Sequence, residues 1–161
     1  MNDTPLAIFL TWTVYGTFLQ GDRRGWRKFR KGERPPQPKL VEWHKSQLKH
    51  PVILLSSHWQ TIVEATIERH CEIRGWKLWA RACRTNHVHV VFTAPGYDGA
   101  TVRDQLKAYA TRDLRNDSGL FAERPVWTRY GDWDCLNTED DLEAAVLYVT
   151  ECQDRMHLPR Y

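Results

Sequence analysis

The sequence predicts an α+β fold in which helices cover an antiparallel β-sheet. Strand-like and helix-like segments follow one another in the order strand, helix, paired strands, helix, strand, helix. The strand candidates alternate in polarity and are rich in β-branched and aromatic residues, whereas the helix candidates repeat apolar residues every three or four positions. A chain of 161 residues with no internal repeat is long enough for one core. We therefore expect a single domain spanning residues 1–161.

The amino-terminal third is expected to contain one strand, a loop and a weak helix. Residues 6–15 are β-branched and aromatic and predict the first strand. The segment 21–39 combines a basic cluster with three prolines within residues 35–38, which favours an extended loop. Residues 40–50 have weak helical patterning that ends at a proline.

A helix and a hairpin are predicted for the middle of the chain. The helix begins with a serine N-cap at Ser56 or Ser57 and ends near a glycine. Residues 76–84 then alternate in polarity and predict a strand. The next strand follows a turn at residues 85–86. We expect these two strands to form an antiparallel hairpin at the centre of the sheet.

The last third is expected to contain two helices and two short strands. The first helix runs from about residue 99 to 115, and the strand candidates are residues 126–130 and 133–136. Asn137 or Thr138 caps the last helix. The apolar stripe of that helix is formed by Leu142, Val146, Val149 and Met156.

Two histidines stand in the predicted strand after residue 86, with one apolar residue between them. Because side chains alternate across a strand, His87 and His89 point to one face with their Cα atoms about 6.5 Å apart. Val88, Val90 and Phe92 take the opposite face and supply the core contact. Two neutral imidazoles on one face can converge on a divalent metal ion. The alternative is a pair of histidines that only lines or caps the sheet, and spacing alone does not choose.

A dense basic cluster occupies residues 23–31 and is interleaved with Trp26 and Phe29. The net charge of +3 is too small to indicate a nucleic-acid partner by itself, but eight tryptophans are many for this length. Cations that meet phosphates and flat rings that stack on unpaired bases are the two ingredients of single-strand binding. The alternative is a solvated loop whose tryptophan folds back on the core.

Cysteine spacing and hydropathy exclude several classes of protein. The four cysteines are scattered without a Cys-x-x-Cys pair, so a zinc ribbon is excluded and reduced thiols are expected. No apolar run approaches the ~20 residues that cross a membrane. The N-terminus lacks the basic region of a signal peptide. We expect no membrane partner and a cytoplasmic location.

With these elements placed, the chain resembles the single-tyrosine HUH transposases, those of IS200-type insertion sequences and especially the REP-associated tyrosine transposases. HUH denotes His–hydrophobic–His. Four segments carry the resemblance, and they span most of the chain: residues 10–17, residues 74–91 with the Asn-His-Val-His-Val-Val motif, residues 107–112 and residues 145–149. The resemblance implies a ferredoxin-like or RRM-like HUH nuclease domain.

The activity implied by the resemblance is metal-dependent cleavage and strand transfer on single-stranded DNA that folds into hairpins. His87 and His89 would hold Mg²⁺ or Mn²⁺, which polarises the scissile phosphate. Tyr148 would attack phosphorus in line and leave a 5′-phosphotyrosine and a free 3′-OH. A second 3′-OH would reverse the step and join new ends. Covalent storage of the bond energy removes the need for ATP, and the sequence has no Walker-type loop.

The third metal ligand departs from the family pattern. Many relatives place Gln or Asn four residues after the tyrosine, but here Cys152 holds that position and Gln153 comes one residue later. On a regular helix a step of five residues rotates by roughly 140°, against about 40° for a step of four. A π-bulge near Cys152 would return Gln153 to line, and we favour this ligand. Glu151, a water molecule, or an impaired enzyme are the other outcomes.

Tyr109 is the rival nucleophile, but it lies at helical spacing from Leu106 and Val102 and so fits a core face. We expect the DNA contacts to come mainly from the basic cluster. The predicted DNA-binding residues are Arg23, Arg24, Trp26, Arg27, Lys28, Arg84 and Lys107.

Two rival functions stay open beside the transposase. The first is a domesticated protein that binds DNA hairpins and no longer cuts them, and the displaced Gln153 keeps this reading open. The second is a small metal-dependent phosphoesterase that uses water and forms no tyrosine adduct. The resemblance is compatible with a monomer or a homodimer, because relatives of both kinds are known.

Overall fold

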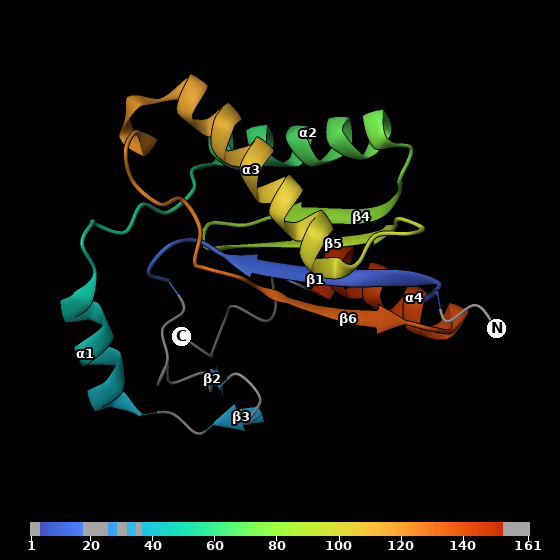
Figure 1. The fold of residues 1–161 in the computed structure, drawn as a ribbon, viewed down its shortest axis with the longest axis horizontal. Coiled ribbons are helices and arrows are strands. Elements are labelled where there is room, and N and C mark those ends of the chain that lie inside the picture. Colours follow the sequence, from blue (N-terminus) through green and yellow to red (C-terminus); the bar gives the residue numbers. More distant parts are fainter. Residues whose placement is uncertain (1–3, 18–25, 29–31, 35–36, 153–161) are drawn as a thin grey trace.

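The computed structural model describes residues 4–17, 26–28, 32–34 and 37–152, and the statements below concern these residues. Its centre is a four-stranded antiparallel sheet, drawn as arrows in Figure 1. The strands lie in the order β4-β5-β1-β6. Their bounds are β1 Ala7–Thr13, β4 Lys77–Cys83, β5 His87–Thr93 and β6 Asp132–Leu136. The α+β class predicted from the sequence is confirmed.

Helices cover both faces of this sheet (Figure 1). The helices α2 (Ser57–Arg74) and α3 (Gly99–Asp117) lie on one face, where their apolar residues join the larger core. The helix α4 (Glu139–Leu147) continues into a π-helical turn, η2 (Tyr148–Cys152), on the other face. The succession β1, α2, β4, β5, α3, β6 with this strand order is the ferredoxin-like arrangement. No helix in the described residues is both long and apolar enough to cross a bilayer.

Side-chain caps begin α2 and α4, as the sequence predicts. The Ser56 hydroxyl accepts a hydrogen bond from the backbone N–H of Trp59 at 3.3 Å, which sets the start of α2. Thr138 does the same for α4, with the N–H of Asp141 at 3.1 Å. The helix α2 ends at Gly75, whose φ of 73° is a left-handed C-cap that favours glycine.

The face under α2 and α3 is built from large apolar side chains. Alternate residues of β1 and β5 point to it, and Leu10, Trp12, Val88, Val90 and Phe92 are all at most 1% exposed. Each such side chain stabilises the fold by roughly 1.5–3 kcal/mol through the water it excludes. This face holds most of the core.

The face under α4 and η2 is built from smaller residues. Ala80 and Ala82 of β4 and Ala7 of β1 lie there, with Val91 in the middle. The helix α4 itself has no buried residue and rests on this face through half-buried side chains. The histidines of β5 lie on this face, where α4 and η2 cover it.

Three sequence expectations are corrected by the sheet. The hairpin of β4 and β5 is not central, because β1 pairs with β5 and leaves β4 at the edge. Residues 126–130 form no strand, since their pairing is limited to one bridge between Trp127 and Val14. The segment 21–39 is not a plain loop, because β2 (Trp26–Lys28) and β3 (Gly32–Arg34) pair within it.

The remaining helix, α1 (Pro38–Gln47), begins two residues earlier than the predicted segment 40–50. A proline in the first turn suits a helix start, because the N–H groups of that turn have no intrahelical acceptor and a proline there loses no hydrogen bond. The helix α1 has no buried residue and stands away from the sheet (Figure 1). Cys71, Cys83 and Cys135 form no disulfide, and Met156 of the predicted stripe lies outside the described residues.

Candidate active site

The two histidines of β5 share one face of the sheet. The rings of His87 and His89 lie with their centroids 4.7 Å apart and their planes at 69°. Both side chains are buried, at 9% and 7% exposure, on the face that α4 and η2 cover. Their neighbours along the strand, Val88 and Val90, point into the opposite core. The alternation predicted from the sequence is therefore correct.

Hydrogen bonds orient both imidazoles through the same ring nitrogen. The amide oxygen of Asn86 lies 2.6 Å from Nδ1 of His87, and because that oxygen only accepts, Nδ1–H is the donor. The hydroxyl of Thr11 shares a hydrogen bond of 2.7 Å with Nδ1 of His89. With Nδ1 held in this way, Nε2 is the nitrogen of each ring that could ligate a metal ion, which is the usual arrangement at metal sites.

Tyr148 is the aromatic neighbour of this pair. Its half-buried ring lies 5.5 Å from the ring of His89, edge to face, and 5.9 Å from that of Phe9. Phe9 and His89 are themselves 5.3 Å apart. The rings of Phe9, His89 and Tyr148, from β1, β5 and η2, therefore pack against one another. This packing holds the phenol beside the histidine pair.

The helical turn that begins at Tyr148 is a π-helix and extends to Cys152. A π-turn bonds residue i to residue i+5, so a step of five residues completes one turn rather than overshooting it. This is the bulge that would return position 153 to the tyrosine's side. Gln153 itself lies outside the described residues. Glu151, the alternative ligand, is exposed.

The donor set fits part of a divalent-metal site. The described residues contain no cluster of three or more His, Cys, Asp and Glu side chains. Two imidazoles whose Nδ1 atoms are hydrogen-bonded leave the other coordination positions to oxygen ligands, as from a phosphate or water. Mg²⁺ and Mn²⁺ both take oxygen ligands, so His87 and His89 are compatible with either ion when a phosphate completes the shell.

The predicted DNA-binding residues are only partly described. Arg23 and Arg24 lie outside the described residues, and for Trp26, Arg27 and Lys28 the structure describes the backbone of β2 alone. Arg84 lies in the turn before the histidines, where its backbone N–H donates to the carbonyl of His87 at 2.8 Å. That contact places Arg84 next to the histidine strand.

Lys107 lies on the other side of the sheet, in α3. Its ammonium donates to the carbonyls of Thr128 and Tyr130, both at 2.8 Å. Burial and the nearby guanidinium of Arg103 lower the pKa of Lys107 to about 8. The structure thus separates this lysine from the histidine pair and ties it to the loop that precedes β6.

Tyr109, the rival nucleophile, also lies in α3 and is not brought to the histidines. Its ring stacks on His70 with centroids 4.5 Å apart. Its neighbours Leu106 and Ala110 are fully buried in the larger core. Of the two tyrosines considered, Tyr148 is the one beside His89.

The sequence predicts strand β1 but not its place beside the histidines. Thr11 of β1 pairs in register with His89, and Thr13 pairs with His87. Phe9 adds the third ring of the aromatic cluster. The alternation of residues 7–13 already puts these three on one face, but only the strand pairing brings that face to β5.

The fold has a counterpart among solved structures. A REP-associated tyrosine transposase bound to a REP hairpin superimposes with a TM-score of 0.54 over 98% of this chain and 73% of that chain, at 11% sequence identity. The chain shares the fold of a tyrosine transposase. At this identity the likeness concerns the fold alone. No protein-family model matches the sequence, and no curated protein matches it either.

Proposed function

We propose that this chain is a metal-dependent endonuclease and strand transferase for single-stranded DNA, a single-tyrosine HUH transposase. The observation that carries the proposal is the ring of Tyr148 lying 5.5 Å from that of His89, with His87 alongside. The fold shared with a hairpin-bound tyrosine transposase supports the same function.

Tyr148 is the proposed nucleophile. A phenol with a pKa of ~10 is mostly protonated at neutral pH, so it must lose its proton in the attack. The new bond joins the phenolic oxygen to phosphorus, and the bond from phosphorus to the 3′-oxygen breaks. The 3′-oxygen leaves with the electron pair and takes up a proton. A 5′-phosphotyrosine and a free 3′-OH result, and a second 3′-OH reverses the step.

His87 and His89 are the proposed metal ligands, through Nε2. When bound, Mg²⁺ or Mn²⁺ supplies Lewis-acid polarisation of the phosphate. The residues that orient the ligands are Asn86 and Thr11, whose oxygens hold the two Nδ1 atoms. Gln153 is the proposed third ligand, and the π-turn over Tyr148–Cys152 supports this choice over Glu151.

The proposed substrate is a DNA hairpin with a single-stranded flank. The neighbour with the same fold is bound to a REP hairpin. The basic cluster from Arg23 to Lys28, with Trp26, and Arg84 beside the histidine turn would contact the phosphates and bases. Lys107 lies in α3 on the opposite face of the sheet, so it would contact the DNA only if the DNA also reached that face.

The decisive experiment is covalent trapping. The probe is a labelled hairpin oligonucleotide built on an imperfect palindrome from the DNA that flanks the gene. The protein with Mn²⁺ should form a denaturant-resistant adduct, and Tyr148→Phe should reduce it by at least about 10³-fold, because a nucleophile has no substitute. Hairpin affinity should be unchanged. Tyr130→Phe, an exposed tyrosine outside the aromatic cluster, is the matched control.

Retention of the adduct in Tyr148→Phe would move the nucleophile elsewhere. A second candidate, a hairpin-binding protein that no longer cuts, is favoured by one observation: among the described residues, no group of three or more His, Cys, Asp or Glu side chains could hold a metal ion. That protein would bind the hairpin and give no adduct in its native form. Product release without an adduct would instead identify the water-using phosphoesterase.

A further inference from the structure

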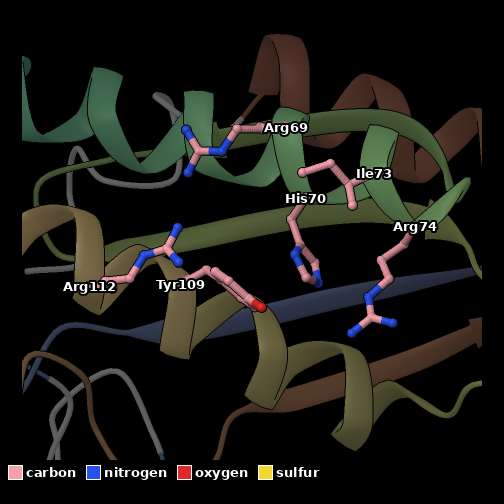
Figure 2. Close-up of a pocket in the computed structure, with 6 residues that line it drawn as sticks. All are labelled: Arg69, His70, Ile73, Arg74, Tyr109 and Arg112. Atoms are coloured by element: carbon pink, nitrogen blue, oxygen red, sulfur yellow. The ribbon is translucent and has the colours of Figure 1, made fainter.

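A basic cavity lies between α2 and α3, on the sheet face opposite the histidine pair. Its volume is about 220 Å³. Figure 2 shows side chains from both helices around it, with Arg69 and Arg112 reaching toward each other and Arg74 beyond His70. The lining residues are Arg69, His70, Ile73, Arg74, Tyr109 and Arg112. The proposed transposase chemistry uses none of them.

Positive charge at this cavity exceeds negative charge. Asp113 is the carboxylate that faces the guanidiniums, and it forms ion pairs with Arg69 and with Arg112, the latter at 3.4 Å. Arg74 is exposed and makes no ion pair within the described part of the chain. Three guanidiniums and one carboxylate leave an excess of about two positive charges. A single carboxylate ligand would neutralise only one of them.

The floor of the cavity is rigid. His70 is 5% exposed, and its Nε2 lies 2.9 Å from the side-chain oxygen of Gln105. The His70 ring stacks on Tyr109 at 4.5 Å and meets Trp76 edge to face at 5.3 Å. The guanidinium of Arg112 lies over the Tyr109 ring at 4.7 Å. This stacking restrains the guanidinium before any ligand binds, so little side-chain entropy is lost on binding.

The guanidiniums nevertheless have N–H groups available. Each guanidinium carries five donors, and the ion pairs with Asp113 use one nitrogen of Arg69 and one of Arg112. These side chains are 50% and 55% exposed, so the other donors reach solvent. The planar fork of arginine matches phosphate oxygens in a bidentate manner. The cavity is smaller than a typical pocket for a drug-sized ligand, but it admits a phosphate.

We propose that this cavity binds a phosphate group, with Arg74 and Arg112 as its principal donors. The phosphate comes either from a nucleic-acid backbone or from a small phosphorylated molecule. The proposal goes beyond the transposase function and does not depend on it, because it requires neither the histidine pair nor Tyr148. If the source is DNA, the strand contacts both faces of the protein.

The test compares two double variants that each remove two positive charges. Arg74→Gln with Arg112→Gln changes the cavity. Lys45→Gln with Lys49→Gln is the matched control, because these lysines are exposed and lie away from the cavity. Inorganic phosphate should shift the arginine side-chain N–H signals in NMR spectra of the native protein and the control. The cavity variant should lose that saturable shift.

The second arm uses an unstructured oligothymidylate and measures affinity against salt concentration. Loss of the one phosphate contact that the cavity makes should reduce the slope of log K against log salt by about 0.7, the value per contact for single strands. The control should keep the native slope. A loss of phosphate binding with an unchanged slope identifies a small phosphorylated molecule as the ligand. A reduced slope in addition identifies DNA.

The proposal is overturned if the cavity variant binds phosphate as the native protein does, or if the lysine control loses as much. Arg112 contacts Tyr109, so its substitution can disturb the fold. Arg74→Gln alone then carries the test, because its side chain has no partner among the described residues. It should weaken phosphate binding and leave the amide spectrum unchanged. The Tyr148→Phe variant should bind inorganic phosphate as the native protein does. That result would distinguish the cavity from the proposed active site.

Discussion

The two faces of the sheet are built from the same strands and differ in almost every other respect. Toward α2 and α3, β5 presents Val88, Val90 and Phe92, each 0% exposed. Toward α4 and η2 it presents His87 and His89, beside the alanines of β4 and the rings of Phe9 and Tyr148. One face is filled with large apolar side chains, and the other combines smaller apolar residues with the two imidazoles. The two-residue period of a strand thus separates the main core from the candidate site.

The largest expected effect sharpens this comparison. Phe92→Ala should lower the free energy of unfolding by about 3–5 kcal/mol, because it removes a ring from the packed face and leaves a cavity. The measurement is urea denaturation followed by circular dichroism. His89→Ala, three residues earlier on the other face, should lower the free energy of unfolding by less than half as much and should abolish the proposed DNA cleavage. Equal losses of stability would break the separation of the two faces.

A medium effect is expected from filling the alanine-lined face. Ala82 pairs in register with His89 and is 6% exposed. Ala82→Leu should destabilise the fold by about 1–3 kcal/mol, because the added atoms have no space under η2. Displacement of the Tyr148 or His89 ring by about 1 Å should also slow adduct formation by roughly 10²-fold.

The control for Ala82→Leu is Ala108→Leu, on the exposed side of α3. This substitution adds the same atoms at a solvent-exposed position, where they meet no packed neighbour. Neither the free energy of unfolding nor the rate of adduct formation should change. An unchanged rate of adduct formation in Ala82→Leu would mean that the positions of the Tyr148 and His89 rings do not depend on the packing beneath η2.

The smallest expected effect concerns a charge beside the packed face. The pKa of Lys107 is about 8 in the folded chain, against an ordinary value of 10.5. Between these values the unfolded chain binds more protons than the folded chain, so the free energy of unfolding contributed by Lys107 rises from pH 8 to 10.5. Unfolding measured across this window should show a rise in the native protein that Lys107→Gln lacks.

The same scan on Lys49→Gln is the control, because Lys49 is exposed and should leave the native pH dependence intact. A rise that persists in Lys107→Gln would assign it to another group. Direct observation of the Lys107 side chain by NMR should give its midpoint near pH 8.

Much of the architecture was predictable because it depends on local patterns. Period-two alternation places His87 and His89 on one face, and residue type narrows the helix caps to Ser56 or Ser57 and to Asn137 or Thr138, of which Ser56 and Thr138 are the caps observed. The position of β4 at the sheet edge was not predictable in this way. One feature of the sequence is consistent with an edge strand: Trp79 interrupts the register between β4 and β5 and is 41% exposed, and edge strands tolerate such irregularities.

The support of the candidate site was harder to predict, because it is made by long-range pairing. Thr11 and His89 are 78 residues apart in the chain, and their hydrogen bond exists only once β1 lies beside β5. The contact between Lys107 and the carbonyl of Tyr130 likewise depends on the loop before β6 folding back on α3. The π-turn was foreseen as one of three outcomes, since five-residue spacing alone is compatible with each.

The segment that carries Tyr148 buries one side chain completely and otherwise rests on the sheet through half-buried side chains. Val149 is 0% exposed, whereas α4 contains no buried residue. Exposing a single valine costs roughly 1.5–3 kcal/mol, a small part of what holds α2 and α3 in place. Amide protons of α4 should therefore exchange with solvent well before those of α2. Under the proposed function, lifting this weakly held segment would give a bulky polynucleotide a way to reach the imidazoles that lie beneath the phenol.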